Sequence, residues 1–412
     1  MQRRNRLIRK KYVSGKKHVF FAIVLAAAIG SAVYAAPDVG RVPMERAGKS
    51  AEQSSAEFIV NQGLGMGIDE TDGSYYPIEL FVAERNTCFF VRMEPEVMQE
   101  VDGTSTLLIS NGTDAWRFED SQYLNEYGLL CFDTSKQSTW DEGRYDVRVD
   151  FPDGSRLEEE IVFREMKDIE ILLVPIDGFY SGEIRKTGEF DERLCEYTEK
   201  VCPMGRNDLK WSVYSGEEAV FENSKYDLDT SIGRLRVWQY LKMLHGQSDS
   251  DMVIGIVAEN MKREPPAKEA AVTGFTFGDY VSVISLEDTC PSVTIAHEIG
   301  HCLSLGDEYE NGTLSVSMNM APYKMKGKNR YSLSEIVEGT NPYIKGGAAD
   351  GRQGSGTVVY AEQYPYDVFS GELIGHDMTS FMGLSGYPES EYWVTAQIWE
   401  SLYQELVEEE KE

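Results

Sequence analysis

Positively charged residues are scarce in this chain of 412 residues. The sequence holds 40 Lys and Arg against 69 Asp and Glu, and eight of the 40 lie in residues 1–35, which contain no acid. The rest of the chain therefore carries 32 basic against 69 acidic side chains, and such a surface repels nucleic acid and anionic lipid. We expect neither a nucleic acid nor a membrane surface as a partner of the folded part.

Long hydrophobic runs are also rare, and the one that is present follows the basic start of the chain. Residues 19–36 are apolar and uncharged. The small side chains of Val33 and Ala35 suit cleavage by signal peptidase before Ala36. The run is also nearly long enough to stay in the membrane as an uncleaved anchor. Residues 1–35 are thus predicted to be a signal peptide or an N-terminal anchor, and the folded part is predicted to be secreted or extracytoplasmic.

Cysteine is limited to six residues. In an exported protein an even number of cysteines favours disulfide bonds. The spacing along the sequence favours three pairs: Cys88–Cys131, Cys195–Cys202 and Cys290–Cys302.

Two segments of different character follow the leader. Residues 36–73 are polar and rich in Gly and Ser, which is typical of a linker. In residues 74–166, short alternating apolar runs recur between turn signals such as Asp153-Gly154. About seven strands of this kind predict an all-β, immunoglobulin-like sandwich. The tyrosine found two residues before the second cysteine in true immunoglobulin domains is replaced by Leu129.

The pattern changes in residues 167–412. The continuous apolar run at 169–176 predicts a strand buried on both faces. Helical periodicity at 190–201, 230–246 and 292–303 alternates with strand-like runs, which predicts an α/β domain. The C-terminal segment 391–408 reads as an amphipathic helix that docks on the core.

Histidine is the rarest of the ionisable residues, with five in the chain, yet two of them stand four apart in the segment "TIAHEIGHCLSLGDEY". Residues four apart share one face of a helix, so His297 and His301 can present both imidazoles to one zinc ion. Glu298 lies one residue further round, where its carboxylate can take a proton from an attacking water. A catalytic zinc needs three protein ligands, and no third histidine follows.

The full segment resembles the metzincin signature, in the branch whose third zinc ligand is aspartate. Its Asp-Glu-Tyr ending is similar to that of secreted bacterial metzincins of the IgA-peptidase-like type. This resemblance implies His297, His301 and Asp307 as zinc ligands and Glu298 as general base. The turn glycine of the signature is replaced by Ser304, and Gly306 can permit the turn that brings Asp307 back to the metal.

Two further segments fit the same resemblance. Metzincins carry a methionine turn beneath the zinc followed by a C-terminal helix, and Met382 is the matching methionine, with Met378 as the weaker candidate. The strand-like segment 278–286, just before the histidine helix, would be the edge strand that holds an extended substrate. Candidate cleft residues of lower rank are Glu308, His376 and Tyr387. Glu308 is an alternative ligand, His376 is better explained by a structural or solvated role, and Tyr387 is a candidate for stabilising the tetrahedral intermediate.

The sequence therefore predicts an exported zinc metallopeptidase that acts on a protein or peptide substrate. One alternative is a catalytically silent binding or adhesion protein that zinc merely stabilises. Another keeps the enzyme but takes its third ligand from a distant glutamate, such as Glu335 or Glu338, as in thermolysin-like enzymes.

Overall fold

The structure is a computed structural model in which most of the strands and helices after residue 55 are described. The chain divides into Met1–Gln53 and a compact unit, Ser54–Glu412, to which every described residue belongs. Within the described residues, no helix combines the length and the apolar character needed to cross a bilayer. The leader and its apolar run lie outside them. The described residues are 56–69, 72–93, 104–124, 128–132, 134, 137–176, 193–214, 228, 231–257, 261–262, 271–272, 274–276, 280–285, 290–303, 305, 358–383 and 388–407.

The N-terminal part of this unit consists of strands in the order β1-β5-β8-β7-β6-β9-β10-β4. All neighbouring pairs are antiparallel except β10 and β4, which are parallel. The strands are β1 (Ala56–Asn61), β4 (Phe81–Val82), β5 (Cys88–Met93), β6 (Thr106–Ser110), β7 (Ala115–Leu124), β8 (Leu129–Phe132), β9 (Gly143–Asp150) and β10 (Arg156–Arg164). Each run of alternating apolar residues expected in this region is thus a strand.

The expected immunoglobulin-like sandwich of two separate sheets is not supported. The long strand β7 pairs with β6 through its first half and with β8 through its second half, and the register shifts between Asp120 and Gln122. A bulge of this kind bends a strand. The eight strands therefore form one continuous order, and both halves contribute to a core around Trp140.

The predicted linker, residues 36–73, also differs from the structure in its second half. Residues 56–61 form β1, and residues 66–68 form β2 (Met66–Ile68), which pairs with β3 (Tyr75–Pro77). The apolar side chains of Phe58, Ile59 and Val60 are buried there. Their burial accounts for strand formation in a stretch whose flanks are polar. The proposed boundary near residue 166 falls inside the compact unit and stays a prediction.

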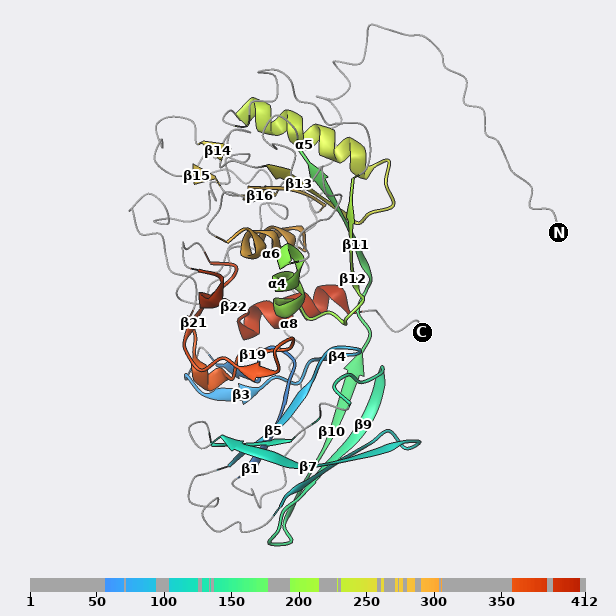
Figure 1. Cartoon of the computed structure of the whole chain (residues 1–412), viewed down its shortest axis with the longest axis vertical. Helices are drawn as coiled ribbons and strands as arrows, with labels where there is room; N and C mark the ends of the chain where they lie inside the picture. Colours follow the sequence, from blue (N-terminus) through green and yellow to red (C-terminus); the bar gives the residue numbers. More distant parts are fainter. Residues whose placement is uncertain are drawn as a thin grey trace, which may run out of the picture. The chain divides into compact units, whose positions relative to one another are not determined.

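The α/β part predicted for the second half of the chain is confirmed (Figure 1). A sheet of order β12-β11-β13-β17-β16 is parallel except for its last strand, which is antiparallel. The strands are β11 (Ile169–Pro175), β12 (Leu209–Val213), β13 (Met252–Val257), β16 (Gly274–Thr276) and β17 (Val281–Ser285), and the helices are α4 (Arg193–Val201), α5 (Ser231–His245), α6 (Pro291–Cys302) and α8 (Ala396–Leu406).

Helices cover both faces of this sheet. On one face, Leu172 and Val174 of β11 pack with Val237 and Leu241 of α5. On the other face, the alternate residues of the same strands join a core that includes α4, α6 and α8. Figure 1 shows α5 on one side of the sheet and the other three helices on the opposite side.

The predicted edge strand is wrong. Segment 278–286 contributes β17, which lies between β13 and β16 and whose residues are all buried. Among the described strands, β16 is at this edge of the sheet. The difference arises because an apolar run such as that of β17 fits a strand covered on both faces, whereas the shorter β16 is placed by the helix against which it lies.

Three short strands and a turn complete the part of the fold beneath α6. β21 (Met378–Ser380) pairs with β18 (Val358–Val359) and with β22 (Tyr392–Trp393). A tight turn follows β21, in which Gly383 N donates to Ser380 O at 2.9 Å. α8 then begins at Ala396, and the hydroxyl of Thr395 accepts from Ile398 N at 3.2 Å as its N-cap.

Arg85 joins the N-terminal strands to α4. Its guanidinium donates to the carbonyls of Glu199, Lys200 and Met204 at 2.7–2.9 Å and to that of Gln62 at 2.7 Å. The side chain is buried, and it lies over the ring of Trp399 of α8. One arginine thus satisfies carbonyls at the C-terminal end of α4 that the helix cannot satisfy itself.

The predicted disulfide bonds are not found. All six cysteines lie in the described residues, and none is joined to another. Cys290 and Cys302 stand at opposite ends of α6, about 18 Å apart at ~1.5 Å per residue, and Cys195 and Cys202 are about 10 Å apart along α4. A disulfide allows no more than about 7 Å between Cα atoms. Cys131 is paired across the sheet with Phe90 and not with Cys88.

Candidate metal centre

The histidine helix α6 begins at Pro291 and ends at Cys302. Proline suits the first helical position because its missing N–H would have no partner there. The apolar residues Val293, Ile295 and Ile299 are buried and fix the helix on the core. The rings of His297 and His301 then lie on one face, with centroids 4.6 Å apart and planes at 84°.

Backbone carbonyls orient both imidazoles. His297 Nδ1 lies 3.1 Å from Phe381 O, and His301 Nδ1 lies 2.9 Å from Leu305 O. A carbonyl only accepts, so each Nδ1 carries the proton and donates. In the neutral form of each ring, Nε2 is then the nitrogen that can bind zinc.

The chain turns immediately after the second histidine. Leu303 N donates to Ile299 O, and Leu305 N donates to Gly300 O, both at 2.9 Å. The second bond spans five residues, so the helix stops at this point and the backbone folds back. An early stop is what a ligand six residues beyond His301 requires.

The predicted third ligand lies outside the described residues, as do Ser304, Gly306 and the alternative ligand Glu308. Within the described residues there is no group of three or more side chains able to hold a metal ion. The two imidazoles and their Nδ1 partners nevertheless fit zinc, because they supply two oriented nitrogen ligands from one helix face.

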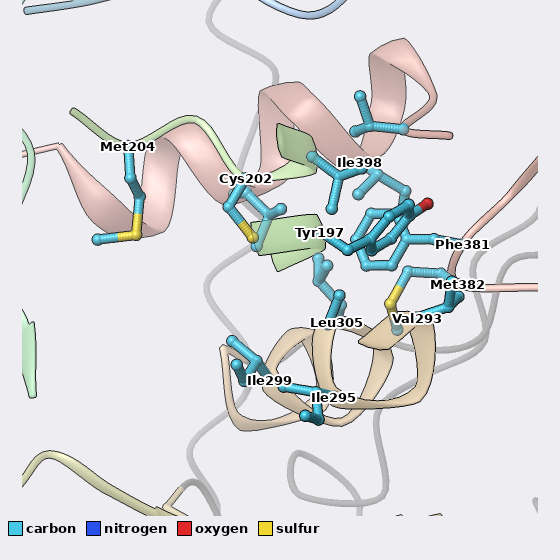
Figure 2. Packing of buried hydrophobic residues seen from close by; sticks show 14 of the residues in the cluster. Tyr197, Cys202, Met204, Val293, Ile295, Ile299, Leu305, Phe381, Met382 and Ile398 are labelled. Atoms are coloured by element: carbon cyan, nitrogen blue, oxygen red, sulfur yellow. The ribbon is translucent and has the colours of Figure 1, made fainter. Parts of the chain in front are cut away.

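Met382, the predicted turn methionine, lies against α6, and its role beneath a metal stays a prediction. It is completely buried in the Ser380–Gly383 turn. A Cβ added to Gly300 would lie 2.6 Å from Met382 Sδ, so the helix and the sulfur touch at a position where glycine leaves room. Figure 2 shows Met382 against α6, next to Val293 and Phe381. The turn therefore supplies both the support below the helix and the carbonyl that orients His297.

Glu298 is buried, with 5% of its surface exposed, and it lies against the edge strand β16. Thr276 Oγ1 donates a hydrogen bond to Glu298 Oε2. A Cβ added to Gly274 would lie 2.5 Å from Glu298 Oε1. The carboxylate therefore sits between the histidine helix and the edge of the sheet.

The remaining candidate residues either make their contacts elsewhere or are not among the described residues. His376 is exposed, and its Nε2 lies 3.3 Å from Ser390 O. Met378 is buried at the start of β21, the strand that leads into the turn with Met382. Tyr387 is not among the described residues. Buried Tyr197 of α4 packs near the turn (Figure 2), and burial raises its pKa well above the usual value, with Glu389 adding to the effect.

Sequence reasoning missed the residues that hold the centre together. Gly300 is one of the two variable positions of the motif, and Phe381 and Leu305 act through backbone carbonyls, which no sequence pattern reveals. Thr276 and Gly274 lie more than twenty residues before Glu298. The pattern that could have indicated these two residues is Gly-x-Thr in the short strand β16, which precedes α6 in the chain.

Comparison with known proteins adds distant neighbours. The sequence matches no protein-family model and no curated protein. The archaemetzincin of Methanopyrus kandleri is 14% identical, with 42% of this chain and 94% of that chain covered and a TM-score of 0.25. Metalloproteinase-II of Bacteroides fragilis is 11% identical, with 65% and 87% covered and a TM-score of 0.21.

A polysaccharide deacetylase of Bacillus cereus also matches, at 13% identity over 49% of this chain and 60% of that chain, with a TM-score of 0.17. Scores this low do not assign the chain to a family. The functional conclusion therefore depends on the residues of this chain.

Proposed function

We propose that this protein is an exported zinc-dependent endopeptidase, a metzincin of the aspartate branch resembling the IgA-peptidase-like type. The observation that carries the proposal is the orientation of His297 and His301. Backbone carbonyls accept from Nδ1 of both rings, which leaves Nε2 as the nitrogen proposed to bind the metal, and Glu298 follows the first histidine on the helix. The placement of Met382 beneath the helix adds support.

Each residue has a distinct role. His297 and His301 hold the metal from α6, and Asp307 is the proposed third ligand. Zinc, when bound, polarises the scissile carbonyl and lowers the pKa of the attacking water. Glu298 takes the proton from that water and later passes it to the leaving amine.

The substrate is proposed to be a protein or peptide. A strand edge next to the catalytic glutamate suits an extended peptide, which pairs with the backbone of the edge strand. Export is proposed from the leader, either as a cleaved signal or as an anchor that keeps the enzyme at the membrane.

Replacement of Glu298 tests the proposed reaction. Glu298→Gln keeps the shape of the side chain but removes the base, so zinc content should stay at one ion per chain while hydrolysis of a peptide library falls by about 10²-fold or more. Zinc is measured by elemental analysis and cleavage by mass spectrometry, with and without chelator. Unchanged cleavage by this variant would refute the proposal.

The same preparations separate the rival interpretations. For a silent binding protein, no peptide of the library is cut by the wild type, and partner binding survives chelation. For the third ligand, Asp307→Ala should lose zinc while Glu335→Ala keeps it; the reverse result would place the ligand on a distant glutamate.

A further inference from the structure

The side chain of Glu298 is enclosed by two residues of β16. Side chains alternate along a strand, and Phe275 points into the core shared with α5. Gly274 and Thr276 therefore face the opposite side, toward α6. Besides its bond to Oε2, Thr276 Oγ1 lies 3.2 Å from the backbone oxygen of Glu298, so one hydroxyl contacts both the side chain and the main chain of this residue.

The Thr276 hydroxyl ends a chain of hydrogen bonds. Thr276 Oγ1 is 2.8 Å from Ser282 Oγ, and Ser282 Oγ is 3.2 Å from Cys302 Sγ. A hydroxyl has a single proton. Because Thr276 gives its proton to the carboxylate, Ser282 donates to Thr276 and the Cys302 thiol donates to Ser282. All three donors thus point toward Glu298.

Gly274 supplies the space for the other carboxylate oxygen. An added Cβ would meet Oε1 at 2.5 Å, Cγ of the same side chain at 3.0 Å and Thr294 Cγ2 at 3.0 Å. Any larger residue at 274 would therefore displace the carboxylate. The strand fixes one oxygen by a hydrogen bond and leaves room for the second.

We propose that Thr276 is the positioning residue of Glu298, holding its carboxylate in the orientation needed for proton transfer, with Gly274 providing the space. The proposal rests on the proposed function, in which Glu298 is the general base. A free glutamate side chain samples several rotamers, and a misplacement of about 1 Å can lower a rate by about 10²-fold. The hydroxyl removes that freedom before substrate arrives.

Kinetics of the zinc-loaded protein provide the first test. Thr276→Val keeps the shape of the side chain but removes the donor, so kcat should fall about 10- to 100-fold while KM stays close to the wild-type value. Thr276→Ser restores the hydroxyl and should restore kcat. The matched control is Thr198→Val in α4, because Thr198 is also buried and its hydroxyl has no hydrogen-bond partner among the described residues.

The metal-free protein provides a readout independent of activity. In a double-mutant cycle of Thr276→Val and Glu298→Ala, followed by urea unfolding, the two positions should be coupled by about 10- to 100-fold in the unfolding equilibrium constant. Thr198→Val should show no coupling with Glu298→Ala.

The outcomes distinguish the two proposals. A Thr276→Val variant with wild-type kcat, or a cycle without coupling, overturns the positioning role even if Glu298→Gln is inactive. Clear coupling together with full activity of Glu298→Gln overturns the proposed reaction, because the hydrogen bond between Thr276 and Glu298 would then contribute to stability and not to catalysis.

Discussion

At the scale of single residues, Gly300 and Met382 determine how closely the histidine helix approaches its support. Glycine within a helix is normally unfavourable by roughly 0.5–1 kcal/mol relative to alanine. Here alanine is expected to be the less favourable residue, because its methyl group would lie 2.6 Å from the sulfur of the fully buried Met382. The helix and the turn therefore have to be considered together.

Gly300→Ala is accordingly expected to destabilise the protein by about 1–2 kcal/mol, since overpacking of about 1–3 kcal/mol exceeds the gain in helix propensity. It should also weaken zinc binding, because the turn that is pushed away carries the carbonyl that orients His297. Urea unfolding and zinc titration measure the two effects. Met382→Ala in the same chain should recover part of the stability, and a Gly300→Ala variant more stable than wild type would contradict the overlap.

At the scale of elements, Arg85 is the residue on which the end of α4 depends. Four carbonyl oxygens from three segments surround one buried guanidinium. Burial lowers its pKa to about 10, which still leaves it charged at neutral pH. α4 packs in the same core as α6, so the capping arginine of the N-terminal strands supports the helix beside the candidate metal centre.

Arg85→Ala should lower the free energy of unfolding by about 3–5 kcal/mol, because the carbonyls lose a buried charged partner. Arg85→Lys should recover little of it, since an ammonium cannot reproduce the planar fork. Arg117→Ala, an exposed arginine on β7, is the control and should change stability by about 0.5 kcal/mol or less. Chemical unfolding of the three variants measures the differences, and equal losses at positions 85 and 117 would contradict the capping role.

The helices and strands themselves were largely predictable from the sequence, whereas the order of the strands within each sheet was not. Alternating apolar runs identified seven strands of the N-terminal part, and helical spacing identified α4, α5, α6 and α8. The bulge in β7 and the edge position of β16 escaped prediction, because strand order depends on contacts between residues far apart in sequence. At the site, the motif identified the helix, whereas backbone carbonyls and the Thr276 hydroxyl left no recognisable pattern.

At the scale of the whole molecule, buried thiols are expected to make the free energy of unfolding fall as the pH becomes alkaline. Burial raises the pKa of Cys202 to about 12, and burial together with Cys88 raises that of Cys131 to about 12, from a usual value of 9.0. Between pH 9 and 12 the unfolded chain has lost protons that the native chain keeps. Stability is therefore fully present below pH 9 and is lost as the pH rises toward 12.

Each thiol should contribute a loss of about 1.4 kcal/mol per pH unit in this window. Urea unfolding under reducing conditions at pH 8, 9 and 10 measures the slope. The double variant Cys131→Ala and Cys202→Ala should be less stable at pH 8 but show a flatter dependence on pH. An identical slope in wild type and double variant would show that other groups cause it.

The cap that Arg85 forms on α4 also bears on how this protein arose and can diversify. A C-terminal half transferred by recombination near residue 166 would arrive without the arginine, and the carbonyls at the end of α4 would be unsatisfied in a new host protein. The two halves are therefore expected to have been inherited together. Sequence drift at position 85 is then constrained by α4, a helix that packs in the same core as the histidine helix.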